Sequence, residues 1–233
     1  MQNIIYYEST DSTNQRAKEL PSFEHLDTVV AKSQTLGRGR MGRVFFSPSG
    51  GLYLSVLLSP EAILCPIPLC TFAAAVATSA ALLELGRSTQ IKWVNDLLYE
   101  GKKAAGILTE AVTRDGRPER IIVGIGINLT EPDGGFPEDI KEKATSLSLS
   151  SDPLSLAALI RARIGVYTSL SAEEVMDEYR ARLFVPSDPV TFTNYKEDFK
   201  KETGRMLGVE NDGSLSILTE NGTVRLSSGE ILY

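Results

Sequence analysis

The chain has 233 residues, of which 42% are hydrophobic and 23% are charged, a balance typical of a globular protein with a sizeable core. Its 24 Lys and Arg against 30 Asp and Glu give a net charge of −6. This charge argues against a nucleic-acid partner, because binding to a phosphate backbone needs clustered cations. The most apolar stretch, residues 68–86, is short and contains Glu84, so it indicates a buried helix and no membrane span. We expect Cys65 and Cys70 to be free thiols, and the absence of a signal-peptide pattern at the first residues favours a cytoplasmic location.

Strands and helices are predicted along the chain from the spacing of apolar residues. In residues 52–58 every second side chain is Leu or Val, which is typical of a strand with one buried face. Proline near the start and Gly86 at the end mark the clearest helix. The predicted strands are 4–7, 28–33, 52–58, 91–94, 97–99, 104–112 and 120–127, and the predicted helices are 12–20, 68–85, 153–170 and 172–183.

The order of these elements predicts an α+β fold with a mixed or antiparallel sheet, because hairpin signals replace the regular alternation of a doubly wound sheet. Glu100-Gly101 and Asp115-Gly116 are the hairpin turns. After Pro186 the sequence changes to short strand patterns separated by tight-turn signals, so we expect a main domain over residues 1–186 and a small all-β module over residues 187–233. Its predicted strands are 190–192, 205–209, 214–219 and 223–226.

A loop of glycine and arginine, Gly37-Arg38-Gly39-Arg40-Met41-Gly42-Arg43, follows the second predicted strand. Glycine lets backbone amides approach an anion, and arginine offers a planar fork of donors that suits phosphate or carboxylate. No Gly-Lys-Ser/Thr sequence follows, so the loop is not a P-loop. By itself it predicts phosphate binding, and a solvated basic turn or an RNA-binding tract is the alternative.

Four further clusters hold polar or small residues beside predicted strands and helices. The Asn-Asp pair that ends Lys92–Asp96 can bind a ligand or simply make a turn. Lys102 and Lys103 can be solvated charges, although the small residues 104–106 leave room for a ligand. Gly124–Asn128 places glycines inside a strand, which indicates a close approach by another group. Ser12-Thr13-Asn14 can cap a helix or contribute polar groups to a site.

In this order the clusters resemble the biotin protein ligase family. The family carries Ser-Thr-Asn, a Gln before Gly-Arg-Gly-Arg-x-Gly-Arg, then Ser-Pro, Gly-Leu, Lys-Trp-Pro-Asn-Asp, Lys-x-x-Gly-Ile-Leu and Gly-x-Gly-x-Asn. The chain matches this pattern with Ser12–Asn14, Gln34, Gly37–Arg43, Ser47-Pro48, Gly51-Leu52, Lys92–Asp96, Lys103–Leu108 and Gly124–Asn128. The resemblance covers about residues 5–185 in register, and the C-terminal β module is similar to the family's SH3-like barrel.

The resemblance implies a class II synthetase-like catalytic domain and a two-step reaction. Biotin and MgATP give biotinyl-5′-AMP and pyrophosphate, and a lysine of a biotin carboxyl carrier protein of acetyl-CoA or pyruvate carboxylase then takes the biotinyl group. The implied cofactors are therefore ATP and Mg²⁺, with biotin as substrate and no dedicated protein cage for the metal ion. Homodimers occur in the family, and no residue of the sequence decides the oligomeric state.

The resemblance also assigns roles to single residues. Lys103, Arg40, Asp96 and Arg38 are the expected catalytic residues, with Lys102 as the substitute for Lys103. The expected biotin-binding residues are Ser12, Thr13, Asn14, Gln34, Gly37, Arg38, Gly106 and Gly124. The expected adenylate-binding residues are Arg38, Gly39, Arg40, Arg43, Lys103, Asn128 and Gly126. We expect the glycine-arginine loop to be mobile without ligand and to close over the adenylate.

Two positions depart from the family pattern. Val94 stands where proline is usual, and Phe45 stands where tryptophan is usual; both keep apolar bulk, so we expect little functional change. The N-terminal DNA-binding domain of some members is not expected, because the match begins near residue 5. Lipoate ligases and octanoyl transferases share the fold and are the alternative enzyme class, but they lack this loop. The one histidine, His25, receives no role.

Overall fold

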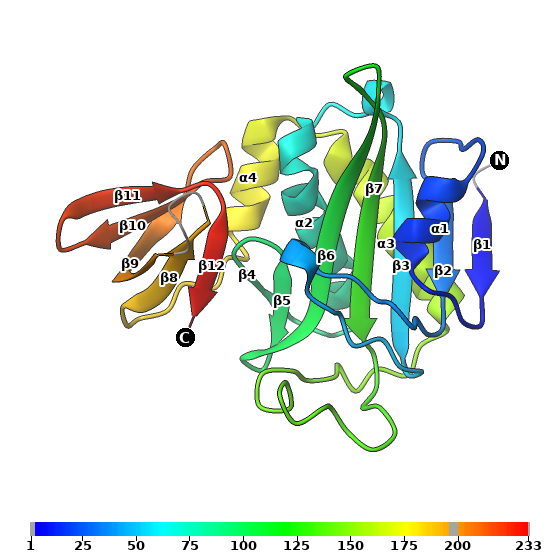
Figure 1. Cartoon of the computed structure of the whole chain (residues 1–233), viewed down its shortest axis with the longest axis horizontal. Coiled ribbons are helices and arrows are strands. Elements are labelled where there is room, and N and C mark those ends of the chain that lie inside the picture. Colours follow the sequence, from blue (N-terminus) through cyan, green and yellow to red (C-terminus); the bar gives the residue numbers. More distant parts are fainter. Residues whose placement is uncertain (1–2, 196–199, 233) are drawn as a thin grey trace.

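A seven-stranded sheet forms the larger part of the computed structural model, which describes residues 3–195 and 200–232. The strand order is β1-β2-β3-β7-β6-β5-β4 (Figure 1). β1 and β2 run parallel and the other neighbours are antiparallel, so the predicted mixed sheet is confirmed. The strands are β1 (Ile4–Tyr7), β2 (Thr28–Ala31), β3 (Gly51–Leu58), β4 (Gln90–Lys92), β5 (Asp96–Tyr99), β6 (Lys102–Arg114) and β7 (Arg117–Asn128).

The two faces of the sheet carry different helices. α2 (Cys70–Glu84) and α3 (Pro153–Thr168) cover one face, and the short α1 (Thr13–Glu19) lies on the other together with the loop between β2 and β3 (Figure 1). Successive side chains of a strand point to opposite faces. The even-numbered apolar residues of β3 therefore join the core under α2 and α3, as predicted, whereas Leu57 packs with Ala17 of α1.

α2 is the central core helix, and a short 3₁₀ turn, Ile67–Leu69, leads into it. Its small side chains let it lie close to the sheet, and most of them are fully buried. Residues 67–84 are long and apolar enough to cross a membrane by composition, but 67% of that stretch is buried inside the fold. The prediction of a buried helix is confirmed. Cys65 and Cys70 at its start are both buried free thiols.

α3 and α4 (Ala172–Arg180) begin at capping residues. Asp152 accepts a hydrogen bond from the backbone of Ser155 at 2.8 Å, and Ser171 forms a reciprocal capping box with Glu174. α4 ends three residues earlier than predicted, because the chain after it pairs with the sheet edge. The amide of Ile91 donates to the carbonyl of residue 182 at 2.7 Å.

The C-terminal residues form a second, five-stranded antiparallel sheet in the order β11-β10-β9-β8-β12, which is compatible with an SH3-like module. Four of its strands were predicted, and β12 was not. The two sheets share one continuous core, and the Trp93 indole donates to the carbonyl of Gly213 at 3.0 Å. The strands are β8 (Val190–Asn194), β9 (Lys201–Val209), β10 (Leu215–Thr219), β11 (Gly222–Leu226) and β12 (Gly229–Leu232).

Candidate active site

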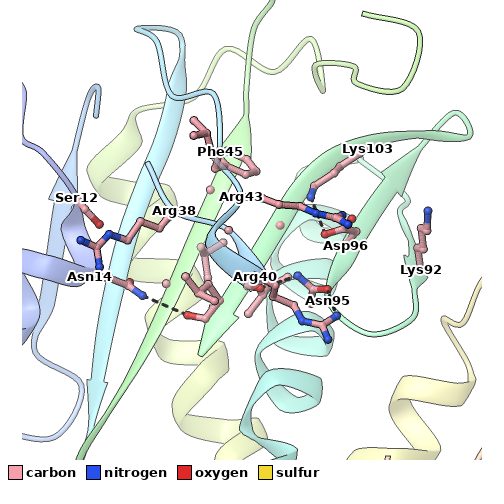
Figure 2. A pocket seen from close by; sticks show the side chains of 18 of the residues that line it. Ser12, Asn14, Arg38, Arg40, Arg43, Phe45, Lys92, Asn95, Asp96 and Lys103 are labelled. Atoms are coloured by element: carbon pink, nitrogen blue, oxygen red, sulfur yellow. Dashed lines mark hydrogen bonds and ion pairs between the residues drawn. The ribbon is translucent and has the colours of Figure 1, made fainter. Parts of the chain in front are cut away.

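A pocket lies on the sheet face that carries α1, enclosed by the glycine-arginine loop, strands β4 to β7 and the edge of the C-terminal sheet (Figure 2). Its volume is about 150 Å³. It brings together most of the residues predicted from the sequence, although they come from segments far apart in the chain. These are Ser12, Thr13, Asn14, Gln34, Arg38, Gly39, Arg40, Arg43, Asp96, Lys103, Gly106, Gly124 and Gly126.

One end of the pocket is polar and is built by the start of α1. Ser12 is the N-cap residue of this helix, yet its side chain makes no capping bond, so helix capping does not explain the hydroxyl. The backbone amide and the hydroxyl of Thr13 both donate to Oε1 of Gln34, at 2.8 and 3.2 Å. Gln34 Nε2 in turn donates to Ser47 at 3.1 Å. A hydrogen-bond network thus holds these side chains in fixed orientations.

The floor of the pocket consists of glycines whose missing side chains leave room for other groups. A Cβ on Gly124 would lie 2.2 Å from Oδ1 of Asn14, and a Cβ on Gly126 would lie 2.5 Å from the ring of Phe45. At Gly106 the nearest atoms belong to Lys103 and Phe45, at 3.1 and 3.2 Å. The protein's own side chains therefore occupy the space over these glycines in this structure.

The other end of the pocket is charged. Lys103 Nζ lies 2.8 Å from Oδ1 of Asp96 (Figure 2), and it lies 5.6 Å from the centre of the Phe45 ring. Lys102 does not line the pocket and lies 3.9 Å from Glu142. Adjacent residues of a strand point to opposite faces, so the structure distinguishes the two lysines and places Lys103 in the site.

The three arginines of the loop diverge (Figure 2). Arg38 points toward Ser12 and Asn14 at the polar end, and Arg40 donates to Oδ1 of Asn95 at 3.2 Å. Arg43 extends toward the charged end and makes a two-pronged contact with Glu230 of β12, with one hydrogen bond of 2.6 Å. In this structure Arg40 and Arg43 bind protein groups at two separate places, and Arg38 lies at a third.

The loop itself is closed by backbone hydrogen bonds. The amide of Gly39 donates to the carbonyl of Arg43 at 2.8 Å, and the amide of Phe45 donates to the carbonyl of Gly37 at 2.9 Å. Met41 at its tip has φ 55°, a left-handed conformation that costs free energy for a residue with a side chain. Met41 and Val44 are 60% and 83% exposed. Few contacts outside the arginine side chains hold this segment in place.

Comparison with known proteins agrees with the order of these motifs. Residues 6–128 match the biotin/lipoate A/B protein ligase family. The bifunctional ligase/repressor BirA of Bacillus subtilis is 35% identical over 99% of this chain and 74% of its own length. The chain belongs to the biotin/lipoate A/B protein ligase family. The biotin–[acetyl-CoA-carboxylase] ligase of Paracoccus denitrificans is 39% identical over 55% of this chain and 56% of its own length.

Solved structures of family members have the same fold. The biotin protein ligase of Aquifex aeolicus in complex with biotin and ATP superposes with a TM-score of 0.84 and 30% identity, covering 100% of this chain and 98% of that one. Its apo structure gives a TM-score of 0.80 and 26% identity, over 100% of this chain and 99% of that one. The likeness extends over both sheets, so the C-terminal module is part of the shared architecture.

The family's Lys-Trp-x-Asn-Asp segment forms the turn between β4 and β5, and the Trp93–Val94 peptide bond in it is cis. Asn95 closes this turn against β6, because its Nδ2 donates to the carbonyl of Ile107 at 2.8 Å and its carbonyl accepts from the amide of Ile107 at 2.9 Å. The turn that was one alternative from the sequence is therefore present, and binding of a ligand by the pair stays a prediction. Asn95 makes the turn and holds Arg40, and Asp96 faces the pocket.

Two residues that the resemblance assigned to the site do not line this pocket. Asn128 donates through Nδ2 to the carbonyl of Thr145 at 3.0 Å and so fixes the segment after β7. Gly37, the first residue of the loop, packs against the segment that follows the loop, where a Cβ on it would lie 2.3 Å from the Phe45 carbonyl and from Ser47 Oγ. The roles expected for Asn128 and Gly37 stay predictions.

The sequence missed the contribution of the C-terminal module. Tyr195, Gly229 and Glu230 line the pocket, and no motif marks them. Arg43 hydrogen-bonds to Glu230 and lowers the pKa of that carboxyl group, so the pair is ionised at neutral pH. Lys92 also lines the pocket, and burial lowers its pKa. A motif indicated Lys92, but only its position in the fold shows where its charge lies.

Proposed function

We propose that this chain is an ATP-dependent biotin protein ligase, which forms biotinyl-5′-AMP and transfers the biotinyl group to a lysine of a biotin carboxyl carrier protein. One observation carries the proposal. A single pocket joins a polar end at Thr13 and Gln34 to a cationic end at Lys103 over a floor of glycines. The Aquifex aeolicus relative, which binds biotin and ATP, superposes over the whole chain.

The polar end suits the ureido ring of biotin, which carries both donors and an acceptor. Ser12, Thr13 and Gln34 are buried or half-buried and line the pocket. A site whose buried polar groups match a ligand discriminates strongly against ligands without those groups, since unmatched groups remain unpaired. This end therefore favours biotin over lipoate or octanoate, which have no ureido ring.

The cationic end suits the first half-reaction, in which two anions must approach each other. The biotin carboxylate attacks the α-phosphorus of ATP, and pyrophosphate leaves with the electron pair of the broken P–O bond. We assign Lys103 to the carboxylate and α-phosphate oxygens, Arg38 and Arg40 to the phosphate side, and Arg43 to pyrophosphate. Cations fixed where negative charge develops are a major source of rate enhancement.

The arginines would have to change partners to act in this way. Arg40 would leave Asn95 and Arg43 would leave Glu230, both of which hold them in the structure. The pocket volume of about 150 Å³ is below the roughly 300–1,000 Å³ typical of ligand sites. Phe45 lies over Gly106 and Gly126, so the proposal requires this ring and the loop to move out and then to close over the adenylate, where the loop would exclude water.

Magnesium enters the proposal with the nucleotide. Mg²⁺ in enzymes of this kind is held mainly by substrate phosphates and water. Among the residues that the structure describes, no three His, Cys, Asp or Glu side chains form a cluster that could hold a metal ion. When bound to the phosphates, the ion would neutralise charge on the pyrophosphate leaving group, and the loop arginines would act beside it.

We assign the second half-reaction to Asp96. The target lysine attacks the carbonyl carbon of the anhydride in its neutral form, and AMP leaves. Asp96 is paired with Lys103 at 2.8 Å, so a substrate phosphate that engages Lys103 would leave the carboxylate available to take a proton from the incoming amine. Asn128 is proposed to recognise adenine. Its Nδ2 already donates to Thr145, which leaves Oδ1 as an acceptor for the adenine amino group.

The remaining assignments rest on the family. We propose the cytoplasm as the location, a carrier domain of acetyl-CoA or pyruvate carboxylase as the partner, and a catalytic unit of residues 1–186 followed by a module of residues 187–233. The relatives in Paracoccus denitrificans and Mycobacterium tuberculosis are named biotin–[acetyl-CoA-carboxylase] ligases, which supports the choice of partner.

The test is incubation of the purified chain with MgATP, biotin and a carrier domain, followed by intact-mass analysis of the carrier. We expect one added biotinyl group, and its absence with a carrier whose target lysine is replaced by arginine. Parallel reactions with lipoate and octanoate should release pyrophosphate far more slowly than the biotin reaction. Equal release with lipoate would replace this proposal with the lipoate ligase alternative.

A further inference from the structure

A second layer of side chains lies behind the polar end of the pocket, and its centre is Glu110 on β6. Its Oε2 accepts from Nδ2 of Asn14 at 2.8 Å, and its Oε1 accepts from Lys18 Nζ at 2.6 Å. Asn14 and Lys18 lie one turn apart on α1, so both reach the same carboxylate. Asn14 is 4% exposed.

The orientation of the Asn14 amide is fixed by its neighbours. Nδ2 faces two acceptors, Glu110 and the carbonyl of Leu108, the latter at 3.4 Å. Oδ1 faces the hydroxyl of Ser55 at 2.6 Å, and Ser55 is fully buried. Burial alone would raise the pKa of Glu110, but the hydrogen bonds from Lys18 and Asn14 outweigh it and hold the pKa below its ordinary value. The carboxylate is therefore ionised at neutral pH and acts only as an acceptor.

This orientation passes to the pocket through Ser55. A hydroxyl has one proton, and Ser55 gives its proton to Asn14. With its proton given to Asn14, Ser55 has none left for Thr13, whose Oγ1 lies 2.8 Å away. Thr13 donates its own proton to Ser55 or to Gln34, so it offers only lone pairs to a ligand. An N–H donor of the ligand matches these lone pairs.

We propose that Glu110 is a positioning residue that sets the donor and acceptor pattern of the polar end, so that Thr13 presents an acceptor to a ureido N–H. The inference rests on the proposed function, since it concerns recognition of biotin by that same pocket. Glu110 touches no reacting atom. It acts through Asn14, Ser55 and Thr13 in that order.

Substitution of Glu110 by glutamine separates this role from general stabilisation. Lys18 can only donate, so it holds the glutamine oxygen and turns the glutamine NH₂ toward Asn14. The Asn14 amide must then turn over, and Ser55 gives its proton to Thr13, which takes up one of the two lone pairs of the Thr13 hydroxyl. In a double variant with Lys18→Met the glutamine is released and can again present its oxygen to Asn14, which restores the original pattern.

The experiment is calorimetric titration of biotin into the full chain without ATP, for the wild type and for E110Q, K18M and K18M/E110Q. We expect E110Q to weaken biotin binding about tenfold, K18M to stay within about threefold, and the double variant to recover to near the K18M value. The Kd for ATP should stay constant throughout. Glu84→Gln, which removes the carboxylate of a different ion pair, with Arg163 at 2.6 Å, is the matched control and should leave biotin binding unchanged.

Unchanged biotin binding in E110Q, or a double variant no better than E110Q, overturns the inference. A second comparison serves if E110Q fails to fold. Two cyclic carbamate analogues of biotin each carry oxygen in place of one ureido N–H. The wild type should bind the isomer that lacks the N–H facing Thr13 about tenfold more weakly than biotin. Equal binding of both carbamate isomers and biotin overturns the inference. A wild type that binds biotin but forms no biotinyl-AMP refutes the proposed function alone, and one that binds no biotin refutes both.

Discussion

Alanine at Gly124 and at Gly126, two positions of the same strand, should have opposite consequences. A Cβ at Gly124 would lie 2.2 Å from Oδ1 of Asn14, and Asn14 is held by Glu110 and Ser55 at 2.8 and 2.6 Å. The amide must move by about 1 Å, because Cβ atoms do not approach oxygen closer than about 3 Å. Both hydrogen bonds are then lost inside the fold.

The magnitude follows from those two bonds. A buried polar group left without a partner costs about 1–3 kcal/mol, so Gly124→Ala should destabilise the fold by about 2–5 kcal/mol. For a protein of this size that corresponds to a fall in Tm of roughly 5–15 °C. A Cβ at Gly126 meets the Phe45 ring at 2.5 Å. That ring belongs to the exposed loop and can move away, so Gly126→Ala should change Tm by no more than about 3 °C.

The assay is thermal unfolding of both variants by circular dichroism, followed by titration with biotin. Gly124→Ala should also lose biotin binding, since Asn14 orients the polar end. Gly126→Ala should keep it. Equal losses of Tm in the two variants, or a larger loss in Gly126→Ala, would refute the reasoning that a fixed side chain lies over one glycine and a movable one over the other.

Four further outcomes are expected. Lys103→Ala should slow adenylate formation about 10²–10³-fold in a pyrophosphate-release assay, because it removes a cation that faces the developing charge. Asp96→Ala should form adenylate normally but fail to transfer it, which single-turnover transfer to the carrier measures. Deletion of residues 39–41 should increase the release of biotinyl-AMP to solvent, measured by chromatography. Glu230→Gln should lower the free energy of unfolding by no more than about 1 kcal/mol, because Arg43 is 59% exposed. The folded-state pKa of Glu230 is lowered, so the ion pair stabilises the fold above the unfolded-state pKa and this stabilisation is lost as the pH falls through the folded-state pKa. The Tm values of the variant and the wild type should therefore converge in acid.

Matched controls separate these effects from loss of folding. Lys102→Ala is the control for Lys103, since Lys102 lies outside the pocket, and it should adenylate at the wild-type rate. Adenylation by Lys103→Ala at that rate would remove it from the mechanism. Loss of adenylate formation in Asp96→Ala would argue against a role confined to the second step. Unchanged leakage after the loop deletion would contradict the closing motion, and a Tm difference for Glu230→Gln that persists in acid would contradict the ion-pair account.

Local patterns sufficed for most of the fold, because they depend on near neighbours in the chain. The period-2 apolar residues of β3, the proline and glycine that bound α2 and the Gly-containing hairpin turns all predicted elements that the structure contains. β12, Gly229–Leu232, was missed, because its pairing with β8 is a long-range contact. α4 was overextended, because pairing of the following residues with Ile91 is a long-range contact.

The sequence by itself indicated most of the residues that line the pocket, since the glycine-arginine loop and the other motifs carry their chemistry in residue type and spacing, but it did not indicate Tyr195, Gly229 or Glu230. Only the tertiary structure decided what each of them faces. Arg43 meets Glu230 across 187 positions, and Asn14 meets Glu110 across 96. No local pattern encodes such partners, because hydrogen-bond direction and ion pairing depend on which strands and helices the fold places side by side. For the same reason only the fold shows that the Asn14 side chain lies over Gly124 and the Phe45 ring over Gly126.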